Sequence, residues 1–99
     1  APPGSDDRSK LFLWYHKLDL DAHSGAVYSL AFSHQGSLLA SGSFDKSIRL
    51  WSLDPHGNLL ASDSLLDHSL NVADVAWSSD DAFVASGSYD KTLKVFDVT

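Results

Sequence analysis

The chain has 99 residues, enough for one small domain, and a net charge of −6. Its seven basic residues form no dense run, which argues against nucleic acid as a partner. It has no cysteine, so disulfides and thiolate metal sites are excluded, as suits the cytoplasm or nucleus. No apolar run is long enough to span a bilayer, and the polar first ten residues do not resemble a signal peptide, so no membrane partner is expected.

The chain begins with a polar segment, residues 1–10, that predicts a flexible leader. Residues 11–22 follow, and their apolar start (LFLWY) predicts an outer strand of a neighbouring or incomplete sheet. Two alternatives stay open for this segment. It is either the remnant of a preceding unit or a single strand donated to another sheet.

A gapless internal repeat follows, in which residues 23–53 recur as residues 68–98. The sequences HSGAVYSLAFSHQGSLLASGSFDKSIRLWSL and HSLNVADVAWSSDDAFVASGSYDKTLKVFDV agree in chemistry at almost every position. Repetition at this period indicates a unit that buries its apolar faces by stacking on copies of itself. The repeat divides the chain into a first unit at 23–67 and a second at 68–99, and it predicts that both are part of a larger assembly.

The sequence of each unit predicts three strands separated by short polar turns. All 13 acidic residues of the chain are aspartate, which favours turns. The expected strands are 27–32, 38–43 and 47–51 in the first unit, with a fourth at 58–65, and 72–77, 83–88 and 92–96 in the second. The chain stops before a fourth strand of the second unit. The first strand of each unit is apolar on both sides, which is typical of a sheet covered on both faces.

The repeat is similar to the blades of WD-repeat β-propellers. The resemblance rests on a histidine, a Ser-Gly-Ser-x-Asp motif about 20 residues later, and a tryptophan that ends the third strand of the first unit. It covers residues 23–98. It implies an all-β fold made of two four-stranded antiparallel blades, the second without its fourth strand, as a fragment of a larger propeller.

In this family a histidine, a serine, an aspartate and a tryptophan form a hydrogen-bonded network that clamps each blade. The matching positions here are His23, Ser41, Asp45 and Trp51 in the first unit, and His68, Ser86 and Asp90 in the second. Phe96 stands where the second unit would have its tryptophan, and phenylalanine has no indole N–H. The resemblance therefore implies one complete and one incomplete clamp.

Histidine, serine and aspartate are also the components of a hydrolase triad. However, Ser41 and Ser86 fall within expected strands, and no Gly-x-Ser-x-Gly motif surrounds either. A clamp is needed once per unit, whereas an active site is needed once per enzyme. The other histidines lack metal-ligand spacing. We therefore expect no catalytic residue, no metal site and no cofactor.

The resemblance implies a non-catalytic scaffold for protein–protein interaction, which binds a protein or peptide on its loop face. The implied contact positions are Ala26, Tyr28, Phe44, Asn71, Ala73 and Tyr89. Two alternatives are a propeller enzyme whose active site lies in blades outside this chain, and a purely structural assembly subunit. The expected further partners are the remaining blades of the same propeller, or other copies of the chain in an even-bladed ring.

Overall fold

The computed structural model describes residues 17, 19–65 and 68–99, and these residues form strands and turns without a helix. No helix that could cross a membrane is found in this described part. The seven strands are β1 (Val27–Phe32), β2 (Leu38–Ser43), β3 (Ile48–Leu53), β4 (Leu59–Leu65), β5 (Val72–Trp77), β6 (Phe83–Ser88) and β7 (Leu93–Asp97). The expected all-β class is confirmed.

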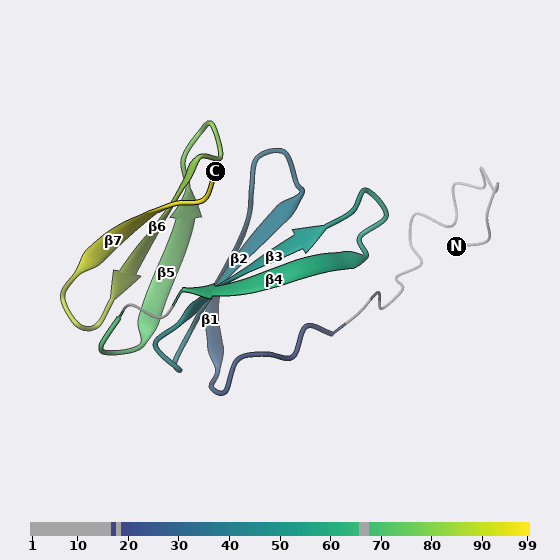
Figure 1. Ribbon diagram of the computed structural model, residues 1–99. Coiled ribbons are helices and arrows are strands. Elements are labelled where there is room, and N and C mark those ends of the chain that lie inside the picture. Colours follow the sequence, from purple (N-terminus) through teal and green to yellow (C-terminus); the bar gives the residue numbers. More distant parts are fainter. Residues whose placement is uncertain (1–16, 18, 66–67) are drawn as a thin grey trace, which may run out of the picture.

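The strands form two antiparallel sheets, one for each repeat. The first has the order β1-β2-β3-β4 and the second the order β5-β6-β7, so neighbours along the chain are neighbours in the sheet. Figure 1 shows the two sheets side by side. The predicted leader lies outside the described residues. The predicted outer strand at 11–22 lies mostly outside them, and residues 17 and 19–22 form no strand, so this strand stays a prediction.

The third strand of each sheet begins one residue later than the sequence predicts, because an aspartate turn precedes it. The backbone N–H of Ser47 donates to Asp45 Oδ1 (3.0 Å), and that of Thr92 donates to Asp90 Oδ1 (2.9 Å). Such an aspartate turn holds the backbone out of the strand ladder. The residue between the aspartate and the hydroxyl residue of each turn is a lysine with a positive φ, 75° at Lys46 and 72° at Lys91.

The buried core lies between the two sheets. Val72 and Val75 of β5 pack against Ala40 of β2 and Ile48 of β3, and all four are buried. This approach requires a glycine at position 42, because a Cβ there would lie 2.7 Å from Val72 Cγ1. Neither sheet could bury these side chains alone, so each sheet depends on the other for its core.

At three places in the described part of the chain, polar contacts also join the sheets. They connect the Ser29 hydroxyl to Asp74 Oδ1 (2.7 Å), the Trp77 indole N–H to the Ala31 carbonyl (2.8 Å), and the His34 backbone N–H to Asp81 Oδ1 (2.8 Å). Each bond runs between one sheet and the other, so the contact between sheets is specified by hydrogen bonds as well as by apolar packing.

The equivalent glycines of the two sheets give the first prediction. We expect Gly42→Ala to lower the free energy of unfolding by about 1–3 kcal/mol, because its methyl group would displace β5. Gly87 has no atom within 4 Å of the corresponding position. We expect Gly87→Ala to be neutral or slightly stabilising, because alanine restricts the unfolded chain. Urea unfolding of both variants measures this, and equal losses would contradict the assigned role of Gly42.

Candidate functional site

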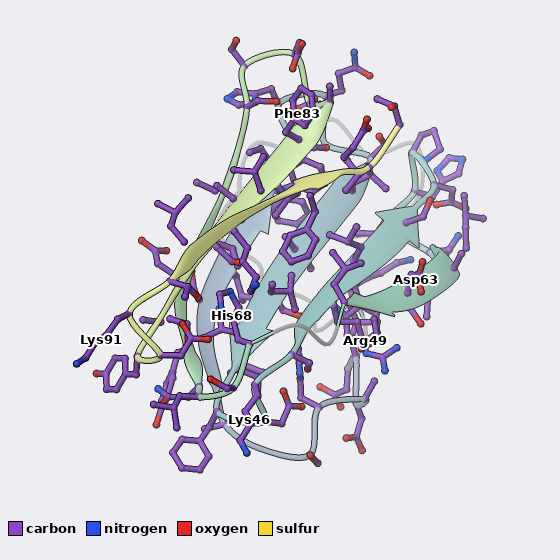
Figure 2. The ribbon with its side chains drawn as sticks, turned by 60° about the vertical axis from the view of Figure 1, so that its left-hand side comes forward. Lys46, Arg49, Asp63, His68, Phe83 and Lys91 are labelled. Atoms are coloured by element: carbon purple, nitrogen blue, oxygen red, sulfur yellow. The ribbon has the colours of Figure 1, made fainter. Side chains whose placement is uncertain are left out.

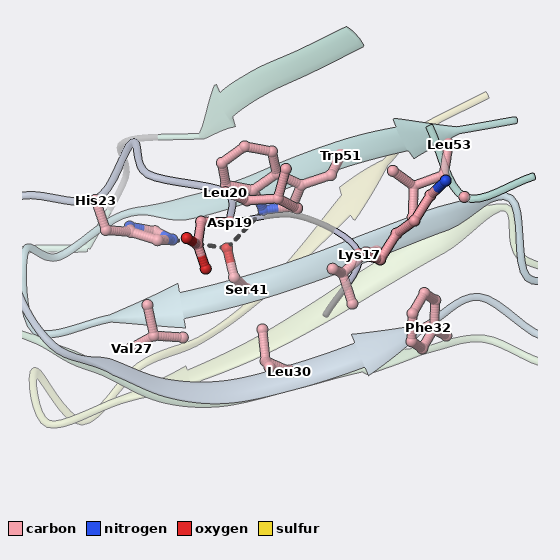
Figure 3. A pocket seen from close by; sticks show the side chains of 12 residues that line it. Lys17, Asp19, Leu20, His23, Val27, Leu30, Phe32, Ser41, Trp51 and Leu53 are labelled. Atoms are coloured by element: carbon pink, nitrogen blue, oxygen red, sulfur yellow. Dashed lines mark hydrogen bonds between the residues drawn. The ribbon is translucent and has the colours of Figure 1, made fainter. Parts of the chain in front are cut away.

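A chain of four side chains ties the first sheet together. Ionised Asp45 only accepts hydrogen bonds, so the ring N–H of His23 lies on Nδ1 and points to Asp45 Oδ2 (2.9 Å). Nε2 of His23 then accepts the hydroxyl proton of Ser41 (2.6 Å), and Ser41 Oγ accepts the indole N–H of Trp51 (3.0 Å). Figure 3 shows His23 and Trp51 on either side of Ser41. Every donor in this chain has an acceptor.

Backbone and hydroxyl donors hold Asp45 in its ionised form. The carboxylate accepts the Ser24 backbone N–H (3.0 Å) and both the backbone and the hydroxyl of Ser47. Burial opposes ionisation, but the bonds from Ser47 and His23 outweigh it, so the pKa of Asp45 lies far below its ordinary value. The carboxylate thereby connects the segment before β1 to the turn between β2 and β3.

The second sheet repeats this arrangement with one bond fewer. His68 Nδ1 lies 2.9 Å from Asp90 Oδ2, and its Nε2 lies 2.7 Å from Ser86 Oγ. The Thr92 hydroxyl and His68 donate to Asp90, which places its pKa far below the ordinary value. Phe96 supplies no donor to Ser86 Oγ, so the second network ends at the serine.

The connectivity serine–histidine–aspartate in both sheets is that of a hydrolase triad. Both serines are buried in the middle of a strand, however, and Ser41 Oγ is already paired with His23 and Trp51. A nucleophile needs access to a substrate and an oxyanion hole beside it. Buried and already paired serines of this kind are typical of a structural clamp. Among the described residues no group of histidine and acidic side chains could hold a metal ion.

The first of the predicted partner-binding clusters comes together at the turn before Asp45. The Phe44 backbone N–H donates to the Ala26 carbonyl (2.8 Å), which fixes the turn beside the start of β1. The Tyr28 and Phe44 rings meet edge to face, with centroids 6.2 Å apart and planes at 89°. Ala26, Tyr28 and Phe44 therefore form one exposed patch.

The second predicted cluster has the same backbone connection. The Tyr89 backbone N–H donates to the Asn71 carbonyl (3.1 Å), and Ala73 is exposed on the adjoining β5. Figure 2 shows Lys46 and Lys91, which follow the two aromatic turns by two residues, at the same end of the molecule, with Phe83 at the opposite end. The structure thus places both aromatic turns at one end of the two sheets.

Sequence reasoning missed the residues that join the sheets, above all His34 and Asp81, whose side chains pair at 2.9 Å. A signal was present, because the copies differ in chemistry there. Gly36 stands at the position equivalent to Asp81, and Phe32 at that of Trp77. Sequence alone gives no reason to connect such differences with a partner sheet.

The outer face of the first sheet, turned away from the second sheet, carries an apolar hollow of about 490 Å³. Val27, Leu30 and Phe32 of β1 line one side, and Trp51 lines another. Figure 3 shows this wall, with Leu20 across the hollow. His23 and Ser41 of the clamp also line the hollow, together with the charged side chains of Lys17 and Asp19. The rest of the lining is mainly apolar.

Comparison with known proteins gives a family match over most of the chain. The family described as WD domain, G-beta repeat matches residues 14–52 and 57–97. Each matched segment contains one of the two clamps described above.

Individual relatives match over about half of the chain. Periodic tryptophan protein 2 homolog of Schizosaccharomyces pombe is 44% identical over 55 residues, which cover 50% of this chain and 6% of that protein. THO complex subunit 3 of Arabidopsis thaliana is 40% identical over 48 residues, which cover 48% of this chain and 15% of that protein. A tRNA methyltransferase regulator of Drosophila melanogaster is 32% identical over 57 residues, which cover 58% of this chain and 6% of that protein. The chain spans a small part of each of these relatives.

The difference between the clamps gives the second prediction. We expect Trp51→Phe to cost about 1–3 kcal/mol of unfolding free energy, because buried Ser41 loses a donor. The reverse change, Phe96→Trp, should stabilise by about 1 kcal/mol by giving Ser86 that donor. Chemical denaturation measures both. Ser86→Ala in the Phe96→Trp background is the control, and a gain that survives it would show that the indole acts only by packing.

The depressed pKa values of Asp45 and Asp90 give the third prediction. The unfolded chain binds protons more readily at these carboxyls, so the stability they contribute is complete above a pH of about 5 and is lost as the pH falls below their unfolded pKa of about 3.9. The Asp45→Asn variant should have a lower free energy of unfolding than wild type at neutral pH. That free energy should fall less than the wild-type value as the pH is lowered. Urea unfolding from pH 7 to pH 3 tests this, and parallel pH profiles for variant and wild type would count against it.

Proposed function

Because the chain belongs to the WD40-repeat family, we propose that it is a non-catalytic scaffold that binds a protein or peptide on the end carrying the two aromatic turns. The family assignment supports a protein-interaction role in general. The name of one relative, THO complex subunit 3, describes a component of a complex. We propose that the partner is met in the cytoplasm or nucleus, where a chain without cysteine is well suited.

The exposure of three aromatic rings carries the proposal. Tyr28, Phe44 and Tyr89 are 54%, 57% and 68% exposed, whereas Trp51 is buried. Aromatic side chains supply large contact areas and lose few rotamers on binding, which makes them frequent hot spots of interfaces.

Preorganisation supports the same surface. The Phe44 turn is held by its backbone bond to Ala26 and by the Asp45 clamp directly after it. Tyr28 stands on β1, a strand paired with β2, and its ring already meets Phe44. Binding of a partner therefore costs little conformational entropy in these groups, and this favours affinity.

The two aromatic clusters differ in chemistry, and this difference indicates how a bound partner would be oriented. The first offers two rings in contact, and the second offers one ring with the amide of Asn71 and the small Ala73. An extended segment across this end would place an apolar side chain on the Tyr28–Phe44 pair and a polar group near Asn71. The hydroxyls of Tyr28 and Tyr89 would add hydrogen bonds to its backbone.

The fourth prediction tests this surface with a peptide selected against the full chain from a random display library. We expect Tyr28→Ala and Tyr89→Ala each to weaken that peptide by more than about 1 kcal/mol, with little change in melting temperature. Isothermal titration calorimetry measures the affinity. Leu30→Ala is the matched control, because Leu30 lies on the same strand as Tyr28 but faces the apolar hollow. If Leu30→Ala abolishes binding while the tyrosine variants do not, the binding surface is the hollow.

A further inference from the structure

Arg49 on β3 is a cation whose donors are mostly unused. The sequence contains 13 aspartates, yet within the described residues no carboxylate forms an ion pair with Arg49. Its Nη1 donates to Ser62 Oγ on β4 (3.3 Å), and its Nε is buried and has no partner in this part of the chain. A guanidinium has five N–H donors in a fixed fork. Arg49 therefore has donors left for further acceptor oxygens close to Ser62.

The position of Arg49 is well defined. Its backbone pairs with Ser41 on one side and with β4 on the other, so it lies in the middle of the first sheet. The guanidinium carbon lies 5.6 Å from the centroid of the Trp51 ring, a cation–π contact. Trp51 is in turn fixed by its indole bond to Ser41 in the clamp. A group that binds Arg49 thus meets a side chain that is already largely ordered.

The Ser62 hydroxyl is accessible and chemically available. Ser62 is exposed, and in the described part of the chain no other serine or threonine hydroxyl is bonded to a basic side chain. Ser62 Oγ accepts the bond from Arg49 and donates none to a described residue, so its proton is free. Ser62 pairs with Trp51, whereas Asp63 pairs with Leu50. Successive side chains of a strand point to opposite faces, so Asp63 does not compete for Arg49.

The strand that carries Ser62 is weakly attached. β4 is at the edge of the order β1-β2-β3-β4, and its first five residues are exposed. It therefore contributes few buried side chains and depends on its ladder with β3. Segments of this kind open locally at low free-energy cost, which lets an enzyme reach a side chain within them. An additional bond between β4 and β3 would have a large effect on such a strand.

We propose that Ser62 is a phosphorylation site, and that its phosphate binds Arg49 and holds β4 against β3. A serine kinase transfers the γ-phosphoryl group of ATP to Ser62 Oγ. The new P–O bond forms as the bond between the γ-phosphorus and the bridging oxygen of ADP breaks, and the hydroxyl proton passes to the base of the kinase. The phosphate brings a charge of about −2 and three acceptor oxygens at neutral pH. The remaining N–H groups of Arg49 bind these oxygens as a fork.

The first test introduces phosphoserine at position 62 of the full chain by amber suppression and follows the phosphate by 31P NMR against pH. The second pKa of a phosphoserine is ordinarily about 6. We expect this pKa to be about 0.5 lower beside Arg49, because a cation favours the dianion, and to return to about 6 with Arg49→Gln. Phosphoserine in place of Ser79 is the matched control. Asp80 and Asp81 follow it, so its pKa should be raised instead.

The second test measures urea unfolding of the same proteins at pH 7.5, after circular dichroism has shown a strand signal in each. The phosphate should raise the folding equilibrium constant about fivefold when Arg49 is present, and should not raise it in the Arg49→Gln background. Phosphorylated and unphosphorylated chains are compared within each background, so any effect of Arg49→Gln on folding itself cancels.

A third test incubates the chain with ATP and a set of purified serine kinases, and mass spectrometry locates the phosphate. We expect Ser62 to be modified, and the corresponding phosphopeptide to be lost with Ser62→Ala. Modification of Ser79 but not of Ser62 by every kinase in the set would overturn the proposal. So would equal phosphate pKa values with and without Arg49, or a phosphate that lowers stability equally in both backgrounds.

Discussion

The close approach of β5 to β1 and β2 creates the core that both sheets share. It buries Val72 and Val75 against Ala40 and Ile48, and Val84 of β6 completes this buried cluster. The approach is possible because position 42 has no side chain. A single sheet of three or four strands offers two faces and can bury neither by itself, so the fold is stable only where sheets meet.

Two sets of hydrogen bonds add to this apolar core, one within a sheet and one between the sheets. The clamp around His23 works within one sheet, where it joins the segment before β1 to the turn before β3. The bonds from Ser29, Trp77 and His34 work between sheets and select which sheet fits against which. The clamp is largely buried, where polar groups must be paired. The Ser29 and His34 bonds between the sheets are exposed and the Trp77 bond is partly buried, so they specify the contact by their geometry rather than by burial.

The clamps and the core do not use the aromatic side chains at the end of the sheets that carries the two turns. Asp45 and Asp90 hold the turns, and strand residues such as Ile48 and Val72 form the core, so the exposed side chains of Phe44 and Tyr89 are not needed for either task. Side chains with no structural task on a rigid support can serve recognition. This is the physical basis on which we propose that end as the binding surface.

The repeating unit of the fold follows from local features of the chain. The 45-residue repeat, the alternation of strand and turn and the position of Asp45 are local or periodic features, so the all-β class and all seven strands could be predicted, with third-strand ends displaced by one or two residues. Which face of each strand meets the other sheet, in contrast, depends on how the two sheets are placed. The β-bulge between Val27 and Ser29 changes which residues share a face, and the pairs Ser29–Asp74 and His34–Asp81 join residues 45 or more positions apart. Such contacts arise from the relative placement of two sheets, and this placement is set by packing around Gly42.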